Sequence, residues 1–136
     1  GFDPELDVFA EMARFFDRSL ELAERAGIRR SKIVLDPGIG FGKTFDQNLA
    51  VLNRLERLKS YCLPLLVGAS RKGFIGKVTG RGVPADRLAG SLAVHVAAAL
   101  KGAAIIRAHD IAAHHDALAM LAALAHETAE PRTCPP

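Results

Sequence analysis

Three short apolar runs recur along the chain, each followed by a polar segment and then by a helical pattern. The runs occupy residues 33–35, 63–68 and 103–106, and the last continues to His109. Their residues do not alternate between apolar and polar, which is typical of strands with both faces buried. Strands that alternate with helices form parallel sheets with right-handed crossovers. The order of elements therefore predicts an α/β fold built from parallel βα units.

The ends of these runs are nearly evenly spaced. Asp36 and Ser70 are 34 positions apart, and Ser70 and His109 are 39 apart. Eight units of this length make a (β/α)8 TIM barrel of about 250 residues, but three strands cannot close one. The 136-residue chain is therefore expected to be either a small open α/β sheet or the C-terminal part of a TIM barrel, incomplete in this chain. Its first residue, Gly1, is not methionine, which favours the incomplete barrel.

Four helices are expected, over residues 5–26, from Thr44 to Leu58, from Pro84 to Leu100, and over residues 111–126. Thr44 and Gln47 have the spacing of a capping box, which marks a helix start. Residues 69–83, rich in glycine and cations, are expected to form a loop. Residues 1–128 are assigned to one domain fragment and 129–136 to a flexible tail.

The composition excludes several classes of protein. Hydrophobic residues make up 49% and charged residues 24%, as in soluble globular proteins. No apolar run approaches the roughly 18 residues of a membrane helix. With no tryptophan, one tyrosine and no basic block, the chain lacks a nucleic-acid platform. Cys62 and Cys134 form neither a disulfide framework nor a zinc motif, which favours a reducing, cytoplasmic compartment.

Polar residues follow the C-terminal ends of the runs, where parallel α/β proteins build their sites. Asp36 comes first, followed by three glycines in five positions. Neither a Walker loop nor a dinucleotide fingerprint fits, because the required glycines are replaced by Pro37 and Lys43. Asp36 is interpreted either as a turn-forming residue or as a ligand carboxylate, which would suit a donor–donor edge such as an aminopyrimidine.

The other two run ends carry cations. Arg71 and Lys72 lie beside small residues and would suit an anionic or polar ligand, or would form a solvated basic loop. Arg107 and His109 are two positions apart and share one side of a strand, where a guanidinium can bind phosphate oxygens in pairs. The alternative is a structural ion pair between Arg107 and Asp110.

Histidines elsewhere are assigned no site. On a helix, His114 and His115 diverge by about 100°, so they do not readily share a metal ion with Asp116. His95 lies on the apolar side of its helix and is expected to be a core histidine. The sequence therefore predicts no metal site within this chain.

Three ordered motifs together resemble the dihydropteroate synthase family: LDPGIGFGK at residues 35–43, VGASRK at 67–72 and IIRAHD at 105–110. The resemblance implies a TIM barrel that joins a dihydropterin diphosphate to p-aminobenzoate and releases pyrophosphate. It further implies a cytoplasmic homodimer, paired through C-terminal helices, in a family that is the target of sulfonamides. The family uses Mg²⁺ on the diphosphate, held mainly by an asparagine from the absent N-terminal half.

The resemblance also implies roles for individual residues. Asp36 would bind the pterin edge, and Lys72 would reach the pterin from the next strand end. Arg107 and His109 would hold the diphosphate, with Lys72 and Arg107 as the catalytic cations. Near the aminobenzoate, Phe41 would pack on the ring. The remaining substrate-binding positions are Gly40, Ser70, Arg71 and Ala108.

One position departs from the family pattern, because Gly73 replaces the hydroxyl or longer side chain that many relatives carry after the lysine. The aminobenzoate carboxylate would then depend on backbone N–H groups. Two other functions stay open: a pterin-binding methyltetrahydrofolate methyltransferase, which needs no diphosphate site, and a non-catalytic half-barrel dimerisation module. The chain alone is expected to be inactive.

Overall fold

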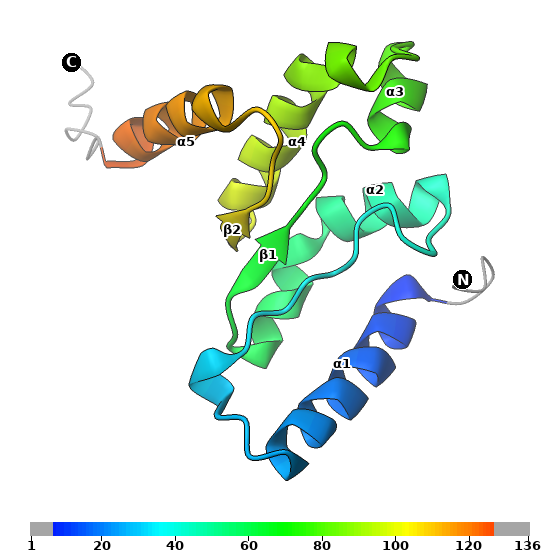
Figure 1. Ribbon diagram of the computed structural model, residues 1–136, viewed down its shortest axis with the longest axis vertical. Helices are drawn as coiled ribbons and strands as arrows, with labels where there is room; N and C mark the ends of the chain where they lie inside the picture. The colour runs from blue at the N-terminus through cyan, green and yellow to red at the C-terminus, as the bar shows by residue number, and fades with distance from the viewer. Residues whose placement is uncertain (1–6, 127–136) are drawn as a thin grey trace, which may run out of the picture.

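The computed structural model describes residues 7–126, with a short parallel sheet flanked by helices (Figure 1). The elements in chain order are α1 (Val8–Arg25), η1 (Arg30–Lys32), α2 (Phe45–Asn53), η2 (Leu55–Tyr61), β1 (Leu65–Val67), α3 (Gly73–Thr79), η3 (Pro84–Arg87), α4 (Leu88–Leu100), β2 (Ala103–Ile106) and α5 (Ile111–His126). Strands alternate with helices, as the sequence predicts.

β1 lies at the centre of the sheet. On one side it pairs in parallel with β2, with Val67 opposite Ile106. On the other side Leu35 forms a single parallel bridge with Leu65. The expected first strand is therefore reduced to one bridging residue, although all three chain segments run in the same direction. β2 lies at the edge, and no further described strand pairs with it.

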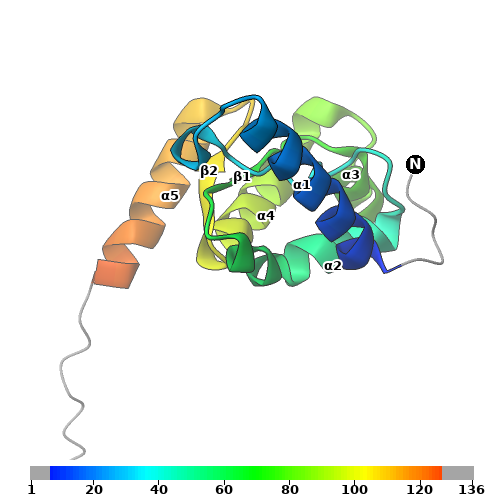
Figure 2. The same cartoon turned by 90° about the horizontal axis from the view of Figure 1, so that it is seen from below.

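The core lies between β1 and the helices. Apolar side chains from α1, α2, η2, β1, α3 and α4 form one buried cluster, which includes Met12, Val51 and Val67. In Figure 2, α1 lies nearest the viewer, and α2 packs between α1 and α4. β1 is buried as predicted, with Leu65 only 1% exposed. The prediction of two buried faces is wrong for β2, where Ile105 is 40% exposed because no described element covers it.

Local signals placed the helix starts well. The Thr44–Gln47 capping box is present, with both reciprocal hydrogen bonds. The expected single helix from Thr44 to Leu58 is instead divided at Arg54, where the backbone leaves the helical region between α2 and η2. Leu55 and Leu58 remain buried in η2. The capping box therefore marked the helix start correctly, whereas the expected continuous helix to Leu58 is wrong.

α3 was missed, because residues 69–83 were expected to form a loop. Two glycines and β-branched residues give Gly73–Thr79 a low intrinsic helix propensity. Burial outweighs that propensity, since Phe74 and Ile75 are only 8% and 2% exposed. Gly76 also allows close packing, because a Cβ there would lie 2.6 Å from the carbonyl oxygen of Arg81.

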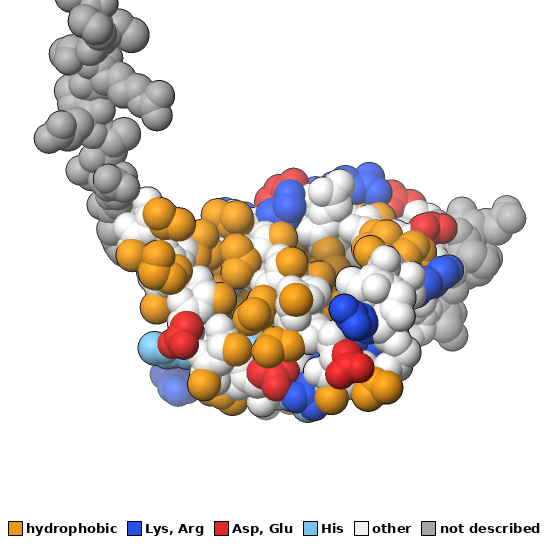
Figure 3. Space-filling view, turned by 90° about the horizontal axis from the view of Figure 1, so that it is seen from above, with side chains coloured by type: hydrophobic (Ala, Val, Ile, Leu, Met, Phe, Trp, Pro, Cys, Tyr) orange, Lys and Arg blue, Asp and Glu red, His pale blue; other side chains and the backbone are white. Residues whose placement is uncertain are grey.

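Hydrophobic side chains gather over part of one face of the molecule (Figure 3). α5 exposes several of its apolar residues, among them Ile111, Met120 and Leu124. Among residues 7–126, no helix has the length and apolar character required to cross a bilayer. Cys62 is an exposed free thiol, whereas Cys134 and the expected tail at 129–136 lie outside the described residues.

Candidate functional site

The ends of the three parallel segments meet at one edge of the sheet. A pocket of about 230 Å³ lies there, lined by Phe41, Gly68, Ser70, Lys72, Arg107, Ala108 and His109. All three polar segments singled out in the sequence therefore contribute to one cavity. The convergence follows from parallel topology, which places the carboxyl ends of the strands at the same edge.

Arg107 reaches this pocket because Gly68 has no side chain. The backbone N–H of Arg107 donates to the carbonyl of Val67 at 3.0 Å, which continues the sheet pairing beyond β2. A Cβ on Gly68 would lie 2.8 Å from both Nε and Nη2 of Arg107, so the guanidinium lies across the Gly68 backbone. The sequence reading did not assign Gly68 this role, because the contact depends on pairing between residues far apart in the chain.

No described residue forms an ion pair with Arg107. The expected alternative, a pair between Arg107 and Asp110, is wrong, because Asp110 binds Arg71 instead. The Arg71 guanidinium donates twice, from Nη2 to Oδ1 at 2.6 Å and from Nε to Oδ2 at 3.2 Å. The hydrogen bond from Arg71 lowers the pKa of Asp110. Arg71 is thus occupied within the fold and is not among the residues that line the pocket.

Lys72 links the first and second segments. Its ammonium nitrogen lies 3.8 Å from the centroid of the Phe41 ring. The aliphatic chain crosses Gly40, where a Cβ would lie 2.9 Å from Cδ of Lys72. Burial lowers the pKa of Lys72, repulsion by Arg107 lowers it further, and attraction by Asp36 raises it. Asp36, Lys72 and Arg107 are therefore close enough to interact electrostatically.

Asp36 both shapes its loop and remains exposed. Its Oδ1 accepts the N–H of Gly38 at 2.8 Å, the hydrogen bond of the turn-forming interpretation. The carboxylate also acts on Lys43, whose pKa is lowered by burial and raised by Asp36. It lines a separate hollow of about 440 Å³, shared with side chains of α1, and not the pocket around Arg107. The two interpretations of Asp36 are thus compatible.

Asn48, which the sequence reading missed, holds the glycine-rich loop to α2. Its Oδ1 accepts the N–H of Gly40 at 2.6 Å, and its Nδ2 donates to the carbonyl oxygens of Thr44 at 2.7 Å and Lys43 at 3.3 Å. The side chain is 4% exposed. A polar residue one turn into the helix was the available signal, because a loop with several glycines needs hydrogen bonds from outside itself.

Replacing Asn48 with alanine is expected to lower the free energy of unfolding by about 1–3 kcal/mol, because the Gly40 N–H and two carbonyls lose a buried side-chain partner. Urea unfolding at neutral pH measures the change. Asn53→Ala, an exposed position at the end of α2, is the matched control and should stay within about 0.5 kcal/mol of the wild type. Equal losses for both variants would contradict the role of Asn48.

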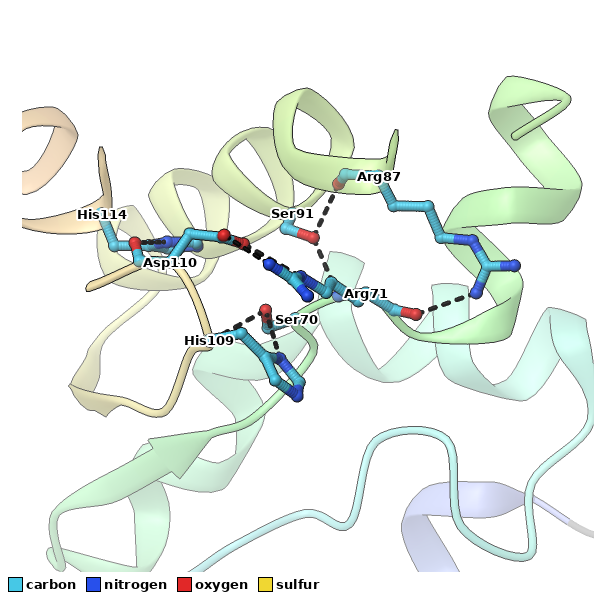
Figure 4. A network of polar contacts seen from close by, with 7 residues as sticks. All are labelled: Ser70, Arg71, Arg87, Ser91, His109, Asp110 and His114. Carbon is cyan, nitrogen blue, oxygen red and sulfur yellow. Dashed lines mark hydrogen bonds and ion pairs between the residues drawn. The ribbon is translucent and has the colours of Figure 1, made fainter. Parts of the chain in front are cut away.

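His109 is oriented by Ser70. The buried Ser70 hydroxyl accepts the backbone N–H of His109 at 3.2 Å and lies 2.9 Å from its Nδ1 (Figure 4). This contact leaves Nε2 as the ring nitrogen available to a ligand. The pocket thus offers one imidazole, one guanidinium and one ammonium, from His109, Arg107 and Lys72, which together favour an anion.

The remaining histidines form no metal site. His95 is fully buried as expected, and its Nε2 accepts the N–H of Ala69 at 3.0 Å. Burial, with a smaller effect of His114, lowers the pKa of His95 to about 4. The ring centroids of His95 and His114 are 4.8 Å apart. Across residues 7–126, no group of three or more histidine, cysteine, aspartate or glutamate side chains is placed to hold a metal ion.

The sequence matches a known family over most of its length. A model described as "pterin binding enzyme" matches residues 3–109. The chain belongs to this family. Relatives of this chain include the dihydropteroate synthase of Escherichia coli K12, 50% identical over 105 residues that make up 77% of this chain and 37% of the relative.

Solved structures of members of this family match the fold of the chain. The dihydropteroate synthase of Xanthomonas albilineans in complex with 7,8-dihydropteroate is 43% identical, with a TM-score of 0.86 over 93% of this chain and 48% of the other. The same enzyme with 4-aminobenzoic acid aligns with the same identity and TM-score, over 93% and 45% of the two chains. The prediction of part of a TIM barrel is confirmed. The chain spans about a third to a half of these relatives.

Proposed function

We propose that this chain supplies the strand-end part of a dihydropteroate synthase active site. That enzyme condenses 6-hydroxymethyl-7,8-dihydropterin diphosphate with 4-aminobenzoate to give 7,8-dihydropteroate and pyrophosphate. The observation that carries the proposal is the pocket that joins Lys72 to the Arg107–His109 pair, with Asp36 close enough to Lys72 to act on it electrostatically. Family membership and the relatives solved with dihydropteroate and with 4-aminobenzoic acid support it.

The geometry suits a reaction in which the leaving group carries the charge. The C–O bond to the diphosphate breaks and leaves a pterin methyl cation. The aniline nitrogen then forms the C–N bond and loses a proton. Because no protein nucleophile is needed, the protein stabilises the departing anion, a task suited to Arg107 and to Nε2 of His109. Lys72 would bind the pterin beside them, and the exposed Asp36 carboxylate would accept from its amino and ring N–H groups.

The family implies Mg²⁺ on the diphosphate, but the described residues do not fit a magnesium site of their own. They provide no cluster of ligand side chains, and one oxygen of Asp36 already accepts the Gly38 N–H.

Calorimetry of the chain with two probes, inorganic pyrophosphate and 6-hydroxymethylpterin, tests the proposal. A synthase site is expected to bind both, because the Arg107 region takes the anion and the Lys72–Asp36 region takes the ring. Binding of the pterin alone would instead favour a methyltetrahydrofolate methyltransferase, and binding of neither would favour a non-catalytic half-barrel. Arg107→Ala is expected to weaken pyrophosphate binding selectively and to leave pterin binding in place.

We propose further that the protein acts in the cytoplasm as a homodimer. Support for the dimer comes from α4 and α5, which leave Leu100, Ile111, Met120 and Leu124 more than half exposed. Sedimentation equilibrium measures the state directly, and a monomer at micromolar concentration would contradict the dimer.

A further inference from the structure

Arg71, between the pocket residues Ser70 and Lys72, has an unusual backbone conformation. Its φ is 58°, in the left-handed region that residues with a Cβ seldom adopt. Cys62 is the only other described non-glycine residue with positive φ. Such a conformation persists where surrounding contacts determine it, so the contacts of Arg71 identify what holds it.

α4 accepts the backbone N–H groups on this segment. The Oγ of Ser91 accepts the N–H of Arg71 at 2.9 Å and donates to the carbonyl of Arg87 at 2.7 Å. One turn further, His95 accepts the N–H of Ala69. Ser91 and His95, four positions apart on one face of α4, are both fully buried. Two polar side chains of a largely apolar helix thus hold alternate N–H groups after β1.

Arg71 is also held at its carbonyl and at its side chain. The Nη1 of Arg87 donates to the Arg71 carbonyl at 2.9 Å, while the other guanidinium N–H groups of Arg87 donate to Arg81 and Gly82. Asp110 binds the Arg71 side chain. Figure 4 shows these contacts around Arg71, with Ser91 on its N–H side and Arg87 on its carbonyl side.

The left-handed residue separates two side chains with different directions. Before it, Ser70 faces His109. After it, Lys72 crosses Gly40 to reach the Phe41 ring. A change of φ at residue 71 would rotate the chain after it and move the Lys72 ammonium. We propose that Ser91 is a positioning residue, which holds Arg71 left-handed and thereby directs Lys72 into the pocket.

The position of Lys72 can be measured without a ligand. Its ε protons are next to the ammonium that lies over Phe41, so the ring current should shift their NMR signals upfield. Phe41→Leu removes the ring and shows how much of the upfield shift of the Lys72 signals the ring causes. Ser91→Ala is expected to reduce the left-handed population about five- to tenfold, and the Lys72 signals should move towards those of the Phe41→Leu variant.

Arg71→Gly separates positioning from general stability, because glycine adopts positive φ without steric cost. The Lys72 signals should stay upfield in Arg71→Gly and also in the double variant Arg71→Gly/Ser91→Ala. If Ser91→Ala does not fold, Arg87→Met provides the same comparison. Arg87 is half-buried and binds the carbonyl of Arg71, whereas Ser91 binds its N–H. Methionine keeps the aliphatic stem and removes the donor to the Arg71 carbonyl.

Two results would overturn the inference. One is unchanged Lys72 signals in a folded Ser91→Ala or Arg87→Met variant. The other is an upfield shift of the Lys72 signals that Ser91→Ala reduces equally with arginine and with glycine at residue 71. The value of positioning Lys72 for catalysis rests on the proposed function, but the NMR measurement of its position does not. Failure of the proposed function would appear separately, as absence of pyrophosphate and pterin binding in a wild-type chain whose Lys72 signals are upfield.

Discussion

Arg107→Ala is expected to slow dihydropteroate formation by about 10²–10³-fold, the usual effect of losing one donor that stabilises a developing anion. The guanidinium lies across the Gly68 backbone and has no ion-pair partner among the described residues, so its charge is available to departing pyrophosphate. The E. coli dihydropteroate synthase, 50% identical over 105 residues, provides a host. This chain would replace the matching segment, and pyrophosphate release would be followed.

The matched control for this prediction is Arg81→Ala, the same change at an exposed arginine in the loop after α3. Its turnover should equal that of the unmodified chimera, which excludes a general effect of lost positive charge. Full activity of the Arg107→Ala chimera would contradict the prediction that Arg107 stabilises the departing pyrophosphate. An inactive parent chimera that is folded would count against the proposed function itself.

The second large effect concerns pH and His95. Its pKa is about 4 in the folded protein, against 6.5 for an unperturbed histidine, chiefly because it is buried. Between pH 6.5 and pH 4, His95 is therefore protonated in the unfolded chain and neutral in the folded chain. The stability contributed by neutral His95 is complete above pH 6.5 and is lost as the pH falls from 6.5 towards 4, by about 3 kcal/mol in all.

Urea unfolding at pH 7 and pH 4.5 measures this loss. His95→Gln is the informative variant, because its amide oxygen can still accept the Ala69 N–H but does not titrate. It should lose about 2–3 kcal/mol less than the wild type between the two pH values. His115→Gln, at an exposed position of α5, should follow the wild type. Parallel pH profiles for wild type and His95→Gln would exclude His95 as the source.

Sequence reasoning succeeded where the signal was local or repeated. The Thr44–Gln47 capping box needs only residues three positions apart. The convergence of the three polar segments followed from parallel topology alone, since the strand order brings their carboxyl ends together. The motifs around Asp36, Lys72 and Arg107 could therefore be placed at one edge before any contact was known.

It failed where the partner lies far away in the chain. Arg71 binds Asp110 from 39 positions away and Ser91 from 20 away. Both separations are far longer than the two to four positions over which strand or helix periodicity brings side chains together, so no local spacing rule predicts them. α3 was missed for a related reason, because burial of Phe74 and Ile75 decides its conformation and propensity does not. Ser91, one turn before the expected core histidine His95 on the same apolar helix, was the signal that was overlooked.

The open edge of β2 has a practical consequence for work with this chain in isolation. Within residues 7–126 its outer backbone groups have no strand partner, and the neighbouring Ile105 side chain is 40% exposed. An unpaired, apolar edge is a template for intermolecular sheet growth. Recombinant material should therefore precipitate more readily as its concentration rises, and a lysine introduced at Ile105 should extend the range over which it stays in solution.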